Sequence, residues 1–225
     1  MENSLFPSGN ASVTGGDGAY GAWTTVFTPS ESLCGFYLGF TTSAYGIFNL
    51  FIGSGTPGTP QVENGCFDTG VQGMVYFPFE VAAGVPIQIQ AWNFNSTTDA
   101  ILFYVVGLPQ GVRKSHNTCQ VLGTSTTDQF TTLATTATQF GTLLGTSLKR
   151  MAIVGGNSSS GTTGSYTVSI GSTGATNILQ NVNFGDPTVA YISAVHEFDV
   201  DLPPSQDIWI TATTATSRAM LYLFY

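Results

Sequence analysis

Three carboxylates alternate along one stretch in the last third of the chain: Glu197, Asp199 and Asp201. Residues two apart in an extended strand share a face, so these side chains would lie together on one side of a sheet. Such a row could bind a hard cation such as Ca²⁺. It also keeps a strand face hydrated and discourages edge pairing, and we favour this second interpretation. A similar stretch at 77–81 carries Glu80 alone, so no metal site is predicted.

The chain has two histidines, His116 and His196. A Ser–His–Asp triad needs a nucleophile on a shaped turn and a carboxylate that orients the base. The chain has no Gly-x-Ser-x-Gly elbow, so His196 beside Glu197 is weak support for a hydrolase. Glu63 and Asp68 fall in a predicted loop, and nothing specifies the cleft that a glycosidase pair requires. We therefore expect a protein that is not an enzyme and needs no cofactor, with a hydrolase as the least favoured alternative.

The sequence Trp92-Asn93-Phe94-Asn95 stands at the end of a predicted strand. An exposed indole offers a flat apolar surface, and neighbouring amides offer hydrogen-bond donors and acceptors. A glycan-binding site would therefore use Trp92, Asn93 and Asn95. The alternative, which we favour, is that the tryptophan packs in a core or between domains.

The strands that would position these residues occur twice. Four stretches recur at a nearly constant offset of about 120 residues. The pairs are 48–55 with 166–174, 77–81 with 197–201, 87–91 with 208–212, and 101–106 with 220–225. Alternating β-branched and aromatic residues between glycine-rich turns are typical of short antiparallel strands. The chain is therefore predicted to be all-β, with two tandem antiparallel, jelly-roll-like β-sandwich domains related by internal duplication.

The repeat and the local composition divide the chain into four parts. The predicted boundaries are a flexible N-terminal arm at 1–20, a first sandwich at 21–107, a linker at 108–128 and a second sandwich at 129–225. The arm is rich in Gly, Ser and Asn, which supply little apolar surface for a core. Leu5 and Phe6 are large apolar residues in this arm, and we expect them to serve in docking.

Composition excludes several functions. Charged residues make up 8% of the chain and the net charge is −8, so the basic footprint of a nucleic-acid binder is missing. No run of 18 apolar residues predicts a membrane span, and no signal segment follows Met1, so synthesis in the cytoplasm is expected. Cys34, Cys66 and Cys119 form no CxxC pair, which argues against zinc. Whether Cys34 and Cys66 form a disulfide is left open.

The stretch from Tyr76 to Ile87, with a strand ending in Ile52-Gly53-Ser54-Gly55 before it, resembles small jelly-roll proteins of tailed bacteriophages. These are head-fibre, spike and capsid-decorating modules. The chain departs from them at Gln88 and Gln90, where arginine is common in that family. In the second copy Pro203-Pro204-Ser205 replaces Ala82-Ala83-Gly84, so the resemblance supports the fold more than a shared ligand.

The resemblance implies a structural virion protein that decorates or cements a capsid or forms part of a fibre. Its partners would be the major capsid protein or other virion proteins. It would work as a homo-oligomer, with a trimer favoured, and would be located in the virion without contacting nucleic acid or membrane. The alternative is a receptor- or glycan-binding adhesion module.

Overall fold

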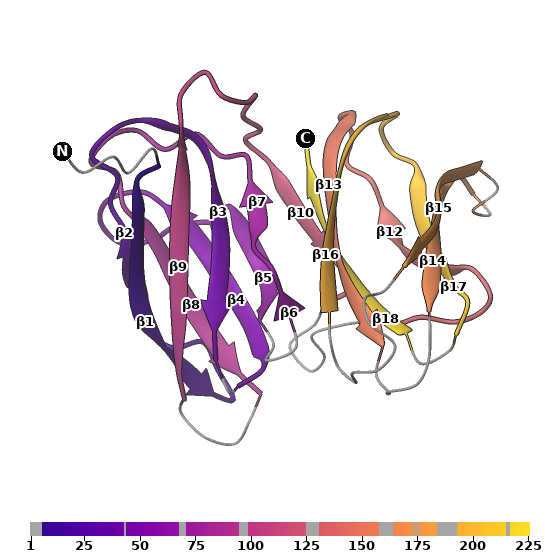
Figure 1. Cartoon of the computed structure of the whole chain (residues 1–225), viewed down its shortest axis with the longest axis horizontal. Coiled ribbons are helices and arrows are strands. Elements are labelled where there is room, and N and C mark those ends of the chain that lie inside the picture. The colour runs from indigo at the N-terminus through magenta and orange to yellow at the C-terminus, as the bar shows by residue number, and fades with distance from the viewer. Residues whose placement is uncertain are drawn as a thin grey trace. The chain divides into compact units, whose positions relative to one another are not determined.

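The computed structural model describes residues 6–42, 44–67, 71–94, 99–124, 131–157, 164–172, 174, 176–183, 193–214 and 217–225. Every regular element within these ranges is a strand, so the all-β prediction is confirmed (Figure 1). The described part of the chain contains no helix long and apolar enough to cross a membrane. The chain divides into two compact units. The first comprises Met1–Thr69, Met74–Cys119 and Phe224, and the second comprises Gly70–Gly73, Gln120–Leu223 and Tyr225.

The first unit is an eight-stranded jelly roll. Its strands are β1 (Ser8–Asp17), β2 (Thr24–Phe27), β3 (Leu33–Thr41), β4 (Gly46–Ile52), β5 (Val62–Phe67), β7 (Val75–Phe77), β8 (Ile87–Asn93) and β9 (Asp99–Pro109). One layer has the order β5-β4-β8-β2 and the other has the order β1-β9-β3-β7. The end of β1 also pairs in parallel with β8, which joins the two layers into one continuous sheet.

The second unit has the same layout in two separate sheets. Its strands are β6 (Val71–Gln72), β10 (Cys119–Leu122), β11 (Thr131–Thr132), β12 (Thr138–Thr142), β13 (Leu148–Asn157), β14 (Ser165–Ile170), β15 (Thr176–Asn183), β16 (Ser193–Leu202), β17 (Asp207–Ala212) and β18 (Ser217–Phe224). One sheet has the order β10-β18-β13-β16-β6, with β11 also on β18, and the other has the order β12-β17-β14-β15.

The two units share topology and register. Layer β5-β4-β8-β2 corresponds to β15-β14-β17-β12, and β1-β9-β3-β7 corresponds to β10-β18-β13-β16. The pairing of β4 with β8 is repeated by that of β14 with β17: Phe48 faces Ala91 as Tyr166 faces Ala212, and Ile52 faces Ile87 as Ile170 faces Ile208. Because a one-residue slip would exchange the faces of a strand, this agreement is specific. The predicted duplication is confirmed.

Alternation along the strands fills each sandwich. In the first unit Phe48, Phe67 and Phe103 are at most 1% exposed, and their rings meet edge to face. In the second unit the core contains Met151, Ile153 and other residues of β13, β14, β16, β17 and β18, and side chains of β15 pack against it. Burying a side chain of this size contributes about 1.5–3 kcal/mol to stability.

The prediction of a flexible arm at 1–20 is wrong for the ten residues of β1, which form an ordered strand. Ser8–Gly15 pairs with Asp99–Val106 of β9, Gly15–Asp17 pairs with β8, and Val13 is completely buried. The composition is poor in β formers, so the strand is held by its ladder to β9 and β8 rather than by propensity. The predicted linker at 108–128 likewise contains β10, which pairs with β18.

Candidate functional site

The three carboxylates on β16 pair with two cations of the neighbouring strand β13. Arg150 is buried and donates from both terminal nitrogens, to Asp199 Oδ1 and to Glu197 Oε2, each at 2.5 Å. Lys149 pairs with Asp201 at 2.5 Å. Asp199 and Asp201 are 85% and 78% exposed, as a hydrated face requires, and the face also carries an ion-pair ladder that the sequence did not predict. No group of three or more potential ligands for a metal occurs among the described residues.

His196 lies on the opposite face of β16 and packs into the second sandwich. Its ring centroid is 6.0 Å from that of Tyr166 on β14. Burial lowers the pKa of His196, and a hydrogen bond with the backbone of Asn183 opposes that effect in part. The Nε2 atom is buried, and no described residue hydrogen-bonds it. These contacts make His196 a packing residue that favours the neutral form.

The cysteines are not bridged. Cys34 and Cys66 are both buried, and neither takes part in a disulfide. The Cys34 thiol donates to the carbonyl oxygen of Pro109 at 3.1 Å. The question that the sequence left open is thereby answered.

Four aromatic rings form a row at one end of the outer face of the β5-β4-β8-β2 layer. Trp92 is flanked by Tyr20 at 5.6 Å and by Phe94 at 6.2 Å, and Phe94 meets Tyr45 at 6.2 Å between ring centroids. All three contacts are edge to face. Tyr45 is 44% exposed, and the other three rings are partly exposed. We call Tyr20, Tyr45, Asn64, Trp92 and Phe94 the Trp92 face.

Asn64 on β5 ties this row to the sheet. Its Oδ1 accepts a 2.5 Å hydrogen bond from the Tyr20 hydroxyl, and its N–H donates to Asn49 Oδ1 at 2.9 Å. Asn64 has a φ of 58°, in the left-handed region that asparagine tolerates better than most residues. Burial and the nearby carboxylate of Glu63 raise the pKa of Tyr20, so its phenol stays protonated and keeps donating.

The three residues predicted to bind a glycan do not all lie on the Trp92 face. Trp92 lies on the partly exposed outer face, as a binding residue must. Asn93 is 1% exposed and its amide donates to Asp99 Oδ2 at 3.0 Å, so its role is structural. Asn95 lies outside the described residues. Tyr20, Tyr45 and Asn64 were not predicted to belong here, because they come from three other segments of the chain.

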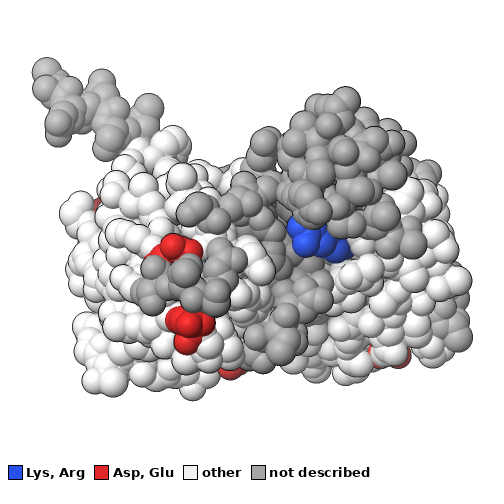
Figure 2. Space-filling model, turned by 90° about the horizontal axis from the view of Figure 1, so that it is seen from below, with Lys and Arg blue, Asp and Glu red and all other residues white. Residues whose placement is uncertain are grey.

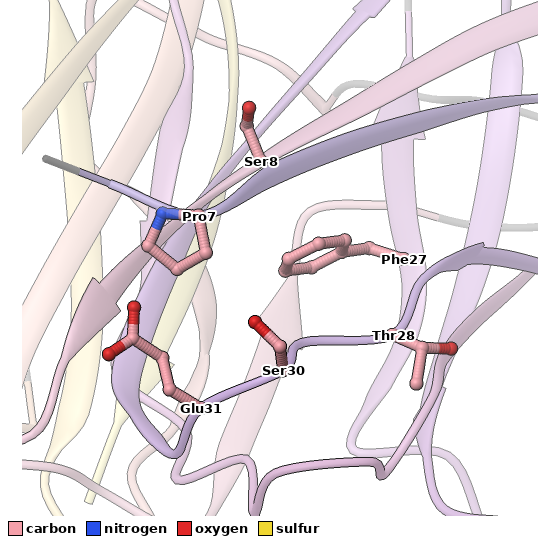
Figure 3. A pocket seen from close by; sticks show the side chains of 6 residues that line it. All are labelled: Pro7, Ser8, Phe27, Thr28, Ser30 and Glu31. Atoms are coloured by element: carbon pink, nitrogen blue, oxygen red, sulfur yellow. The ribbon is translucent and has the colours of Figure 1, made fainter. Parts of the chain in front are cut away.

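A pocket of about 300 Å³ lies at the start of β1 in the first unit. Pro7, Ser8, Phe27, Thr28, Ser30 and Glu31 line it. Figure 3 shows the Glu31 carboxylate turned towards the Pro7 ring and the Ser30 hydroxyl pointing into the space beside Phe27. Gly9 makes room for this arrangement, because a Cβ there would come within 2.5 Å of the Phe27 ring.

The residues predicted for docking lie next to this pocket in the chain. Phe6 precedes Pro7 and is 45% exposed. Leu5 lies outside the described residues. The pocket itself was not foreseen, since its wall joins β1 to the segment that follows β2.

Comparison with known proteins identifies no family. No family model and no curated protein matches the chain. The solved structures that resemble it include Bacillus subtilis oxalate decarboxylase at pH 4.6, with 8% identity over 96% of this chain and 75% of that one, at a TM-score of 0.23. A mutant of the same enzyme gives 9% identity over 90% and 68% of the two chains, at a TM-score of 0.24.

These neighbours bear on the expectation that the protein is not an enzyme. That expectation is withdrawn, because the solved structures that match are those of an enzyme. Their TM-scores are low, so the likeness itself assigns no activity, substrate or metal to this chain.

Proposed function

We propose that the protein is a structural component of a phage-like particle, which decorates or cements a capsid or forms part of a fibre. Jelly rolls are a common architecture of viral capsid domains, although a fold alone does not define a function. The observation that carries the proposal is the exposed Phe6 beside the Pro7–Phe27 pocket. Exposed aromatic side chains and small pockets are features through which proteins anchor on one another.

The sparse charge of the surface agrees with this role. Charged residues are 8% of the chain, against about 25% in an ordinary protein. On the face shown in Figure 2, few blue or red side chains occur among the described residues. Burying such a surface against a shell or a second copy carries a small desolvation cost, because few charges lose their water.

The experiment that tests the proposal locates the protein. An antibody raised against the purified chain is applied to particles purified from the source culture, and bound antibody is imaged by gold labelling in an electron microscope. Labelled particles are the expected result. A protein found only in the particle-free fraction would refute the proposal.

The docking role of Phe6 has a matched control. Val112 is 57% exposed and lies in the same unit, away from the pocket residues in sequence. Particles made with Phe6→Ser should carry fewer copies of the protein, counted by quantitative mass spectrometry, whereas Val112→Ser should leave the copy number unchanged. Equal loss in both variants would exclude Phe6 as the specific anchor.

Self-association is part of the proposal. A trimer should have three times the 23.7 kDa mass of one chain. Light scattering coupled to size exclusion measures this mass directly, and a mass equal to that of one chain at micromolar concentration would contradict the trimer.

A further inference from the structure

The Trp92 face is not required by the fold. Trp92 pairs with Ile47 in the ladder of β8 with β4. In the second unit the shared register places Thr213 and Ser165 at these two positions, and the Ser165 N–H donates to Thr213 Oγ1 at 2.8 Å. The second jelly roll therefore forms with two small polar residues where the first has a tryptophan and an isoleucine.

The aromatic rings of the Trp92 face also lie outside the hydrophobic core of the sandwich. In β8, Ile87, Ile89 and Ala91 are completely buried and face the sandwich interior, whereas Trp92 belongs to the opposite, outer face. Its neighbours Tyr20 and Phe94 stand nearly perpendicular to it, at 78° and 79°. Partly exposed aromatic side chains that the fold does not require are typical of binding surfaces.

Neutral polar groups accompany the rings. The Tyr20 hydroxyl fixes the orientation of the Asn64 amide. Gln90, two residues before Trp92 on the same face of β8, is partly exposed and lies opposite Asn49. Amides both donate and accept, so the surface offers hydrogen bonds of both kinds beside flat apolar rings.

The charge of the first unit restricts the ligand. No lysine, arginine or histidine occurs before Arg113, so the strands that build this face carry no cationic side chain. Phosphate, sulfate and carboxylate ligands are therefore disfavoured, because such anions are usually held by arginine or lysine. A neutral ligand with apolar faces and many hydroxyl groups suits the surface best.

We propose that the Trp92 face is a binding site for a neutral glycan. One sugar ring stacks on the exposed aromatic row, and its hydroxyl groups hydrogen-bond with the amides of Asn64 and Gln90. This site does not depend on whether the protein belongs to a particle.

The test begins with the purified full chain on an array of immobilised oligosaccharides. The array holds neutral glycans ending in glucose, galactose, mannose or N-acetylglucosamine, and sialylated and sulfated glycans for comparison. Binding to at least one neutral group and not to the anionic ones is the expected result. A blank array, or a preference for the anionic glycans, would overturn the proposal.

Variants then assign the site. The oligosaccharide that binds best on the array is titrated in solution by isothermal calorimetry. Trp92→Thr, which copies the residue of the second unit, should weaken binding about tenfold or more. Tyr45→Ser should weaken it severalfold, and Tyr104→Ser, on the outer face of the other layer, should leave it unchanged.

Two outcomes of the titration count against the site. Unchanged binding by Trp92→Thr would place the glycan elsewhere, and equal loss in Tyr104→Ser would show a general effect on the fold. Circular dichroism checks that each variant is folded. If Trp92→Thr does not fold, the glycan affinity of Tyr45→Ser alone tests the site. Tyr45 is 44% exposed, so its removal leaves the core intact.

Discussion

Gly84 and Ser205 occupy the same turn of the two units and share a left-handed backbone, with φ values of 77° and 56°. Each N–H closes an equivalent hydrogen bond, from Gly84 to Pro29 O at 2.8 Å and from Ser205 to Leu144 O at 2.9 Å. The turn is therefore the same in both units, but its left-handed residue is glycine in the first and serine in the second. Serine pays a steric cost at this φ that glycine does not.

Exchanging the two residues should shift stability in opposite directions. Ser205→Gly should raise the free energy of unfolding by up to about 1 kcal/mol, and Gly84→Ser should lower it by about 1 kcal/mol. A Cβ at Gly84 would meet no atom within 4 Å, so the cost is that of the backbone alone. Urea denaturation followed by circular dichroism measures both. Ser54→Gly, at an exposed residue with negative φ, is the control and should be slightly destabilising.

Gly46 should tolerate no side chain. A Cβ there would lie 2.0 Å from the carbonyl oxygen of Trp92 and 2.8 Å from the Phe67 ring. Because the backbone of β8 cannot move away without breaking its ladder, Gly46→Ala should cost at least about 3 kcal/mol. Gly58→Ala, which meets open space, should change the unfolding free energy by less than about 0.5 kcal/mol. Similar costs for the two variants would refute this account of β4.

The two cations of β13 should differ in their contribution to stability. The Arg150 side chain is 8% exposed and its partner Glu197 is 19% exposed, so Arg150→Met leaves a carboxylate poorly solvated. The expected loss is about 2–4 kcal/mol. Lys149 and Asp201 are 44% and 78% exposed, and Lys149→Met should cost less than about 1 kcal/mol. Equal losses by chemical denaturation would contradict the distinction.

His196 should make the second unit sensitive to mild acid. Its pKa in the folded state is lowered by burial, so the unfolded chain takes up the proton first. The stability that depends on neutral His196 is complete above a pH of about 6.5, the ordinary pKa, and is lost as the pH falls below it. On going from pH 7 to pH 5, the unfolding free energy of the native chain should fall more than that of His196→Phe, which lacks the titrating group. Parallel curves would show that His196 does not titrate in this way.

The repeat was visible in the sequence because the strands that carry it alternate strongly, as in Ile87-Gln88-Ile89-Gln90-Ala91. That same alternation places Asn93 on the inner face with Ala91, so its burial could have been predicted. The strand β1 could not, because its stability comes from partners in β8 and β9 that are distant in sequence. The ion pairs of Arg150 were hidden for the same reason, since the register of β13 against β16 is set by tertiary structure.

The pairing of β1 with β9 also bears on the order in which the protein is made. Ser8 pairs with Val106 and Gly15 with Asp99, so β1 is synthesised long before β9, the strand of its own unit with which it pairs. Contacts of such long range slow folding. A segment rich in Gly, Ser and Asn has little tendency to pair with the strands of other chains, so we expect the composition of β1 to limit aggregation while the unit is incomplete.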